Sequence, residues 1–259
     1  MRDDAIELEE SRLQGIEALD EYPWFKDRHR IFPAVFENRN HRKILDLSAG
    51  VGCTAQRIRS DYHAELLCND ISPTCLRILH QLGLPAVSFD IDDKSASFPL
   101  PSNYFDAIIS LVTLEHLMNP GHFLQETHRI IQNKGYLYIS TPNYASLYYL
   151  LRLMAGKSFH DPIHDSYEFY AHVRYYTYRT LLEFVSSFGF SPVAVYIAEM
   201  KSGDHYRKMM SKSRIKACVH RYGRWLMYRL LSPRWTAEPI VCFQKGTGGP
   251  RRRIRKVVL

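Results

Sequence analysis

Short apolar segments alternate with amphipathic ones between residues 43 and 244, and this alternation limits the fold more than any other feature. Seven apolar segments are predicted to be strands: residues 43–47, 65–69, 86–89, 105–111, 136–140, 191–198 and 239–244. Four segments with helical periodicity lie between them: residues 54–60, 73–82, 123–131 and 180–188. Strands joined through helices pair in parallel, because a parallel connection has to cross the sheet. The sequence therefore predicts an α/β fold with a doubly wound, mostly parallel sheet.

The alternation defines a central domain, residues 41–245, with additional segments around it. Residues 1–40 are predicted to form an N-terminal helical cap. Two insertions interrupt the alternation: residues 143–177, which are rich in tyrosine, and residues 201–236. Residues 246–259 begin with a glycine- and proline-rich breaker, so we expect them to form a basic, flexible tail.

The basic charge of the chain is confined to its C-terminal part. Residues 1–200 contain 18 Lys and Arg against 25 Asp and Glu, whereas residues 201–259 contain 16 against 2. A solvated basic face and an anionic partner both account for this excess. Residues 215–231 place apolar side chains at helical spacing beside basic ones, which is typical of a helix on a membrane surface and equally of a surface helix packed on the sheet. With residues 251–256 they predict a peripheral membrane contact, and nucleic acid is the less favoured partner.

Three features indicate the compartment. No stretch approaches the roughly 18 apolar residues that a transmembrane helix needs. The start of the sequence lacks the apolar core of a secretory signal. The five cysteines include no C-x-x-C pair, which favours reduced thiols. We therefore expect a cytoplasmic protein, peripheral at the membrane if the basic segments bind lipid.

The turn after the first predicted strand is the candidate ligand site. It reads Asp46-Leu47-Ser48-Ala49-Gly50-Val51-Gly52, and Asp70 ends the second strand. In an open α/β sheet, ligands bind beyond the carboxyl ends of the strands, where glycines let backbone N–H groups approach them. A carboxylate at the end of the second strand can accept both hydroxyls of a ribose. Two cofactors share this geometry: a dinucleotide, which matches G-x-G-x-x-A from Gly50, and S-adenosylmethionine (SAM), whose amino group makes use of a carboxylate inside the first strand.

Several motifs together resemble those of the class I SAM-dependent methyltransferases. Residues 44–52 are similar to the first motif of that family, D-x-G-x-G-x-G, with Ser48 in place of the first glycine. Residues 98–143 resemble its small-molecule branch, which includes quinone, sugar and sterol methyltransferases. The resemblance implies a Rossmann-like sheet of seven strands whose last strand is antiparallel, with helical insertions and SAM as the cofactor.

The resemblance also implies which residues bind SAM. Asp70 would hold the ribose, Asp90 the adenine amine, and Ile91 would cover the adenine ring. The implied cofactor-binding residues are Asp46, Ser48, Ala49, Gly50, Gly52, Asp70, Ile71, Asp90, Ile91, Leu111 and Glu115.

Histidines are the candidate catalytic bases. Methyl transfer from a sulfonium depends mainly on a positioned acceptor, and an alcohol acceptor also needs a base. His116 follows the fourth predicted strand, and His164 and His172 lie in the tyrosine-rich insertion. We predict a catalytic role for these three, although a lone histidine is more often a structural hydrogen-bonding group.

No metal is expected. His160-x-x-x-His164-Asp165 has the spacing of metal ligands, but spacing alone is a weak signal. A metal-dependent branch of the family, the RNA 3′-end 2′-O-methyltransferases, uses E-x-x-E-H after the fourth strand. Val112 stands here at the position of the first glutamate, which counts against both a metal and an RNA end as substrate.

Taken together, the sequence predicts a SAM-dependent methyltransferase that acts on an oxygen of a small-molecule, sugar or lipid-linked acceptor. Two alternatives stay open. An NAD(P)-dependent oxidoreductase would use the same glycine turn. A non-catalytic protein with a methyltransferase fold would bind nucleic acid or membrane through residues 201–259.

Overall fold

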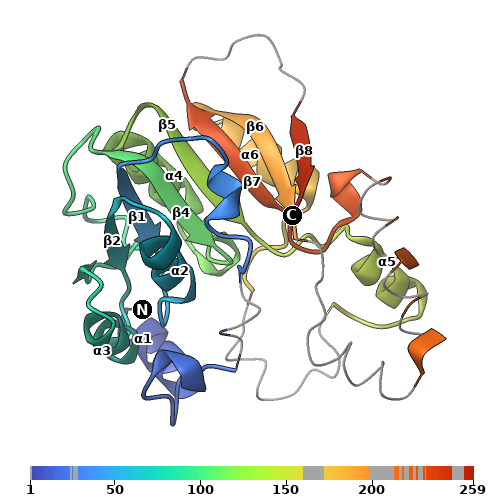
Figure 1. Cartoon of the computed structure of the whole chain (residues 1–259), viewed down its shortest axis with the longest axis horizontal. Helices are drawn as coiled ribbons and strands as arrows, with labels where there is room; N and C mark the ends of the chain where they lie inside the picture. The colour runs from blue at the N-terminus through green and yellow to red at the C-terminus, as the bar shows by residue number, and fades with distance from the viewer. Residues whose placement is uncertain are drawn as a thin grey trace.

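Eight strands form a single sheet in the computed structural model, in the order β3-β2-β1-β4-β5-β7-β6-β8 (Figure 1). The strands are β1 Lys43–Leu47, β2 Glu65–Asn69, β3 Ala86–Val87, β4 Phe105–Leu111, β5 Ile131–Ser140, β6 Phe190–Ile197, β7 Ile240–Lys245 and β8 Arg255–Val258. β7 is antiparallel to its neighbours β5 and β6, and the other pairs are parallel. The predicted α/β sheet, mostly parallel with an antiparallel strand near its end, is confirmed.

The structure describes residues 2–23, 25, 29–159, 172–198, 213–215, 218, 222–223, 226, 230, 232–246 and 254–259. The α-helices with assigned bounds are α1 Arg2–Arg12, α2 Cys53–Asp61, α3 Pro73–Gln81, α4 Pro120–Ile130, α5 Leu147–Met154 and α6 Tyr178–Ser186. Two of these helices begin at a residue whose side chain caps the first turn. Ser72 caps α3 by accepting a hydrogen bond from the N–H of Cys75, and Thr177 caps α6 by accepting one from the N–H of Thr180.

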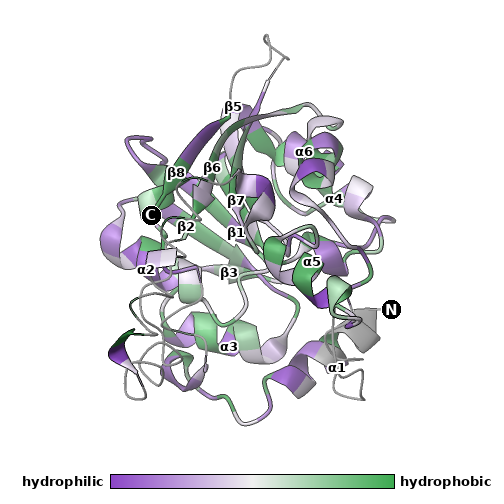
Figure 2. Cartoon of the chain, turned by 90° about the vertical axis from the view of Figure 1, so that its right-hand side faces the viewer, coloured by the Kyte–Doolittle hydropathy of each residue, from purple (hydrophilic) through white to green (hydrophobic). Residues whose placement is uncertain are grey.

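The sheet is covered on both faces. Successive side chains of a strand point to opposite faces, so each central strand contributes to both halves of the core. On β4, Ile108 lies in a cluster with Phe123 of α4 and Leu181 of α6. Its neighbour Ile109 lies in a second cluster with Ile58 of α2. Figure 2 shows the hydrophobic colouring of the central strands that this double burial requires.

The eighth strand corrects the predicted count of seven. Residues 246–259 were expected to be a flexible tail, yet Arg255–Val258 pair in parallel with β6. Val257 and Leu259 pack against the second core cluster, and the Arg255 guanidinium forms a bidentate ion pair with Glu37. The run of arginines before this strand conceals its apolar pattern in the sequence. Residues 247–253 lie outside the described residues.

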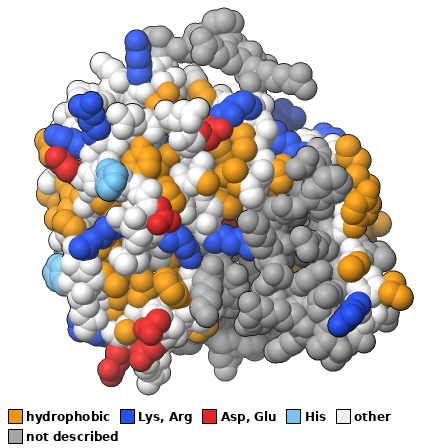
Figure 3. Space-filling model, viewed as in Figure 1, with side chains coloured by type: hydrophobic (Ala, Val, Ile, Leu, Met, Phe, Trp, Pro, Cys, Tyr) orange, Lys and Arg blue, Asp and Glu red, His pale blue; other side chains and the backbone are white. Residues whose placement is uncertain are grey.

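The two insertions are described only in part. The first contains α5, whose apolar side chains are exposed: Leu147 37%, Tyr148 58%, Leu151 54%, Leu153 46% and Met154 82%. Figure 3 shows hydrophobic side chains on the right of the molecule, where Figure 1 places α5. The helix predicted over residues 215–231 lies largely outside the described residues. Among the residues that were described, we find no helix with the length and apolar character needed to cross a bilayer.

The Glu37–Arg255 ion pair predicts a pH-dependent contribution of β8 to stability. Hydrogen bonding to Arg255 lowers the pKa of Glu37 from 4.5 to about 2. The ionised carboxylate therefore stabilises the folded chain above pH 4.5, and this contribution is lost as the pH falls towards 2. Arg255→Ala is expected to lower the free energy of unfolding by up to about 1 kcal/mol at pH 7, because the pair is partly exposed.

Thermal unfolding followed by circular dichroism checks this prediction. The difference between wild type and Arg255→Ala should shrink between pH 4.5 and pH 2. Lys94→Ala, which changes an exposed cation elsewhere, is the matched control. A difference between wild type and Arg255→Ala that stays constant with pH would contradict the role of the pair.

Candidate cofactor and acceptor site

The turn between β1 and α2 has the backbone that a cofactor loop needs. Ser48, Gly50 and Gly52 all have left-handed φ angles, of 60°, 58° and 88°. A Cβ on Gly50 would meet nothing within 4 Å, so the space above this residue is open. A Cβ on Gly52 would lie 2.9 Å from Cδ2 of Leu79, so this glycine lets α3 pack against the turn. Ser48 adopts a conformation that a glycine takes without strain, which explains why the family motif has glycine there.

Two buried carboxylates flank this turn. Asp46 on β1 is 3% exposed, and Asp70 after β2 is 7% exposed. Asp70 accepts hydrogen bonds from the N–H of Gly50, at 2.8 Å, and from the N–H of Ser72, at 3.0 Å. Oδ2 of Asp46 has no hydrogen-bond partner among the described residues. Burial raises the pKa of Asp46 to about 8, with a further contribution from the charge of Asp70, and burial raises the pKa of Asp70 to about 6.

The remaining predicted cofactor residues line the same edge of the sheet or the loops beside it. Ala49 donates its N–H to the carbonyl of Asn69 at the end of β2. Ile91 and Leu111 are buried, whereas Asp90 and Ile71 are partly exposed. Asp90 accepts a hydrogen bond from the N–H of Asp92 at 2.8 Å.

Asp92 is a site residue that the sequence reasoning missed. Its carboxylate accepts hydrogen bonds from the N–H groups of Met118, at 2.8 Å, and Asn119, at 2.6 Å. These bonds fasten the loop after β3 to the loop after β4. The spacing Asp90-x-Asp92 is the signal in the sequence, but it does not reveal which loop the second carboxylate holds.

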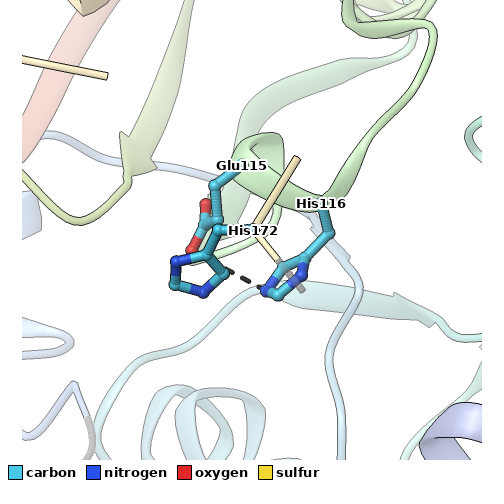
Figure 4. A group of neighbouring side chains, drawn as sticks. All are labelled: Glu115, His116 and His172. Carbon is cyan, nitrogen blue, oxygen red and sulfur yellow. Dashed lines mark ion pairs between the residues drawn. The ribbon is translucent and has the colours of Figure 1, made fainter. Parts of the chain in front are cut away.

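Glu115, His116 and His172 form a second cluster beyond the carboxyl end of β4 (Figure 4). Glu115 is fully buried, and its Oε1 lies 3.9 Å from Nε2 of His116. The two imidazole rings are 4.7 Å apart between centroids, at an interplanar angle of 77°. The carbonyl of Glu115 accepts hydrogen bonds from the N–H groups of Val173 and Arg174, which hold the His172 segment against the turn of Glu115. The structure thus brings together two of the three predicted catalytic histidines, and His164 lies outside the described residues.

Tyr144 joins this cluster from the start of the tyrosine-rich insertion. Its hydroxyl is hydrogen-bonded to Nδ1 of His172. The ring stacks on Tyr149, with centroids 4.8 Å apart, and Tyr175 contacts its edge at the same distance. Burial raises the pKa of Tyr144 well above its ordinary value, so its hydroxyl keeps its proton at neutral pH. The abundance of tyrosine marked the insertion, but nothing in the sequence singled out this residue.

Comparisons with known proteins identify the family. A family model described as a methyltransferase domain matches residues 16–195. The chain belongs to this family. Ajmaline N-methyltransferase from Rauvolfia serpentina is 32% identical over 94 residues, covering 34% of this chain and 32% of that protein. The ubiquinone/menaquinone biosynthesis C-methyltransferase UbiE of Coxiella burnetii is 32% identical over 119 residues, covering 42% of this chain and 47% of that protein. The chain thus spans less than half the length of these curated relatives.

Solved structures share the fold. A putative methyltransferase from Haloferax volcanii, solved in complex with the methyltransferase activator Trm112, has a TM-score of 0.58 at 16% identity, covering 95% of this chain and 98% of that chain. Phosphoethanolamine N-methyltransferase 2 of Haemonchus contortus, solved with S-adenosylhomocysteine, has a TM-score of 0.59 at 12% identity, covering 94% of this chain and 60% of that chain. The methyltransferase family decides between the two cofactors in favour of SAM, and the dinucleotide alternative is wrong.

The residues of the turn fit SAM. The free oxygen of buried Asp46 can accept a hydrogen bond from the cofactor's ammonium group, which also offsets the cost of burying this carboxylate. The open space at Gly50 leaves room for the cofactor beside Asp70.

Cofactor binding is therefore expected to release a proton from Asp46 at pH 7. In the free protein the pKa of about 8 keeps this group mostly protonated, and an ammonium group beside it favours the ionised form. The affinity for S-adenosylhomocysteine (SAH), which carries the same ammonium group, should rise as the pH rises towards 8. Calorimetric titration in two buffers of different ionisation enthalpy measures the released proton. Asp46→Asn should abolish it, and Asp61→Asn at the exposed end of α2 should preserve it; wild-type binding without proton release would contradict the assignment.

Proposed function

We propose that the protein transfers the methyl group of SAM to an oxygen atom of a small-molecule, sugar or lipid-linked acceptor. One observation carries the proposal: buried Glu115 lies beside His116 and His172 at the edge of the sheet that also carries Asp46 and Asp70. Asp46 and Asp70 suit the binding of the cofactor, and the cluster of Glu115, His116 and His172 suits the binding of the group that receives the methyl.

The reaction explains why such a cluster favours oxygen. A lone pair of the acceptor attacks the methyl carbon, the carbon–sulfur bond breaks, and its electron pair neutralises the sulfonium. A neutral amine already has a reactive lone pair, whereas an alcohol must lose its proton to become a good nucleophile. Glu115 places a negative charge beside two imidazoles, which favours removal of that proton from the acceptor. Relatives named as C- and N-methyltransferases share only part of this chain, so their acceptors do not decide the matter.

The orientation of His172 supports a role towards the acceptor. Its Nδ1 is engaged by the hydroxyl of Tyr144. When Nδ1 carries the ring proton and donates it to the tyrosine oxygen, Nε2 keeps its lone pair. The Tyr144 contact thus fixes the direction of the ring.

The exposed apolar side chains of α5 support a lipid-linked acceptor. The helix begins three residues after Tyr144, and none of its residues is buried. The second insertion is strongly basic, and its described residues Ile215, Tyr222 and Leu230 are 78%, 65% and 74% exposed. Apolar side chains together with basic charge complement the surface of an anionic membrane. We propose that α5 and residues 215–231 contact such a surface. A membrane contact was also predicted for residues 251–256, but Arg255 in this run is paired with Glu37.

Replacing either His116 or His172 is expected to slow methyl transfer without changing the affinity for the cofactor. His116→Ala and His172→Ala should lower kcat by about 10²- to 10⁴-fold, the usual contribution of a group that handles a proton. SAH formation from SAM is measured with a panel of hydroxylated sugars, phenols and polyprenyl-linked sugars, and SAH affinity is measured separately. His80→Ala, an exposed histidine on α3, is the matched control.

Two results would contradict the proposal. Transfer confined to amine acceptors would overturn the assignment to oxygen. Tight SAH binding with no transfer to any acceptor would favour the non-catalytic alternative.

The membrane contact is tested with vesicles. Leu151→Asp and Met154→Asp on α5 are expected to reduce cosedimentation with vesicles of phosphatidylglycerol and phosphatidylcholine several-fold, because a charge replaces an inserted apolar side chain. Tyr104→Asp at the amino end of β4, where the side chain is 37% exposed, is the matched control. Wild-type binding that equals binding to pure phosphatidylcholine, or that both α5 variants retain, would contradict the contact.

A further inference from the structure

The N-terminal helix α1 docks beside the start of α3, close to the predicted ribose carboxylate Asp70 (Figure 1). We infer that Glu10 of α1 is a positioning residue for the cofactor, because it fixes Ser72 and, through Ser72, the carboxylate of Asp70. This role uses the predicted contact between Asp70 and the ribose. It is independent of the acceptor that receives the methyl group.

Glu10 contacts two residues at the start of α3. Its Oε1 accepts hydrogen bonds from the hydroxyl of Ser72 and, at 3.0 Å, from the N–H of Thr74. Its Oε2 accepts a hydrogen bond from the hydroxyl of Thr74 at 2.7 Å. The first N–H groups of a helix have no partner within the helix, and a negative charge beside them is stabilising. Glu10 therefore acts as a second cap of α3, supplied by another helix.

Ser72 connects this contact to Asp70. Its hydroxyl, which Glu10 holds, accepts a hydrogen bond from the N–H of Cys75 at 3.0 Å. Its own N–H donates to Oδ1 of Asp70 at 3.0 Å. Oδ2 of Asp70 accepts a hydrogen bond from the N–H of Gly50 at 2.8 Å. A continuous series of hydrogen bonds thus runs from α1 to the glycine turn, and Asp70 lies in the middle of it.

Apolar packing joins the same three elements. Leu13 of the N-terminal cap lies in one buried cluster with Val51 of the glycine turn and Ile78 of α3. Arg77 on α3 also donates a hydrogen bond to the carbonyl of Glu17 in the cap, at 2.9 Å. Docking of the cap and the shape of the turn are therefore linked. Because such coupling is reciprocal, a cofactor bound at the turn should in return stabilise the docked cap.

Charges on α1 act on the same carboxylate. Burial raises the pKa of Asp70 to about 6, and the negative charge of Glu9 adds to this rise. Burial also raises the pKa of Glu10, but its hydrogen bonds to the start of α3 and the charge of Arg77 lower this pKa by more. Glu10 is therefore ionised at neutral pH. Glu10→Gln removes the charge and keeps the size of the side chain, so it tests the contact directly.

A double-mutant cycle that measures SAH affinity of the full chain at pH 7 tests this role. Glu10→Gln is expected to weaken SAH binding about 5- to 20-fold, because Ser72 no longer holds Oδ1 of Asp70 in one place. Asp70→Asn should weaken binding by itself, and adding Glu10→Gln to it should cost less than about 2-fold more. Glu7→Gln, the same change at an exposed position of α1, is the matched control and should leave SAH binding unchanged.

Amide hydrogen exchange provides a second measurement, which decides the matter if Asp70→Asn binds SAH too weakly for the cycle. Saturating SAH is expected to slow exchange in α1 of the wild type several-fold, because the bound cofactor favours the docked helix. Exchange in β8, at the opposite end of the sheet from β2 and β3, should not change. Glu10→Gln should lose most of the slowing in α1, and Glu7→Gln should keep it.

Equal SAH affinity of wild type and Glu10→Gln would overturn the role of Glu10. An equal loss in the wild-type and Asp70→Asn backgrounds would also overturn it, because Glu10 would then act only on the stability of the fold. Unchanged binding by Asp70→Asn would overturn the ribose assignment itself. Thermal unfolding checks each variant first. If Glu10→Gln fails to fold, Thr74→Ala takes its place, since it removes one partner of Glu10 and keeps the charge on α1.

Discussion

Parallel pairing of β1 with β2 and β4 is the constraint on which the site depends. In the register of the sheet, Asp46 lies beside Cys68 on one side and Ile109 on the other. The carboxyl ends of these strands therefore meet at a common edge, and the turns that follow them carry Asp70 and Glu115. The strands themselves are apolar and buried on both faces, so the polar chemistry of the chain collects where they end.

Buried carboxyl groups give this edge its preference for cationic ligands. Asp46, Asp70 and Glu115 are each less than a tenth exposed. Such carboxylates favour ligands that bring positive charge, because burial without compensation is costly. SAM carries an ammonium group and a sulfonium, and the sulfonium is neutralised by the reaction. The same electrostatics that favour binding of SAM therefore favour release of the demethylated product.

A buried amide connects the edge to both insertions. Asn143, just after β5, donates from Nδ2 to the carbonyls of Arg234 and Thr236, which belong to the second insertion. Its Oδ1 accepts hydrogen bonds from the N–H groups of Ala145 and Tyr178, at the two ends of the first insertion. Asn143 thus anchors the first insertion, which carries the proposed acceptor residues Tyr144 and His172, to the end of the core strand β5.

The sequence by itself determined most of the sheet and the glycine turn beside which the predicted cofactor residues lie, because apolar periodicity and left-handed turns are properties of neighbouring residues. The sequence did not predict β8, because Arg255–Val258 become a strand only by pairing with β6. Arg255 also forms an ion pair with Glu37, which lies far away in the chain. The cluster at Glu115 was likewise decided by tertiary structure. His116 and His172 were each recognisable, but their separation of 4.7 Å follows from backbone hydrogen bonds between distant segments, and no spacing in a sequence encodes those.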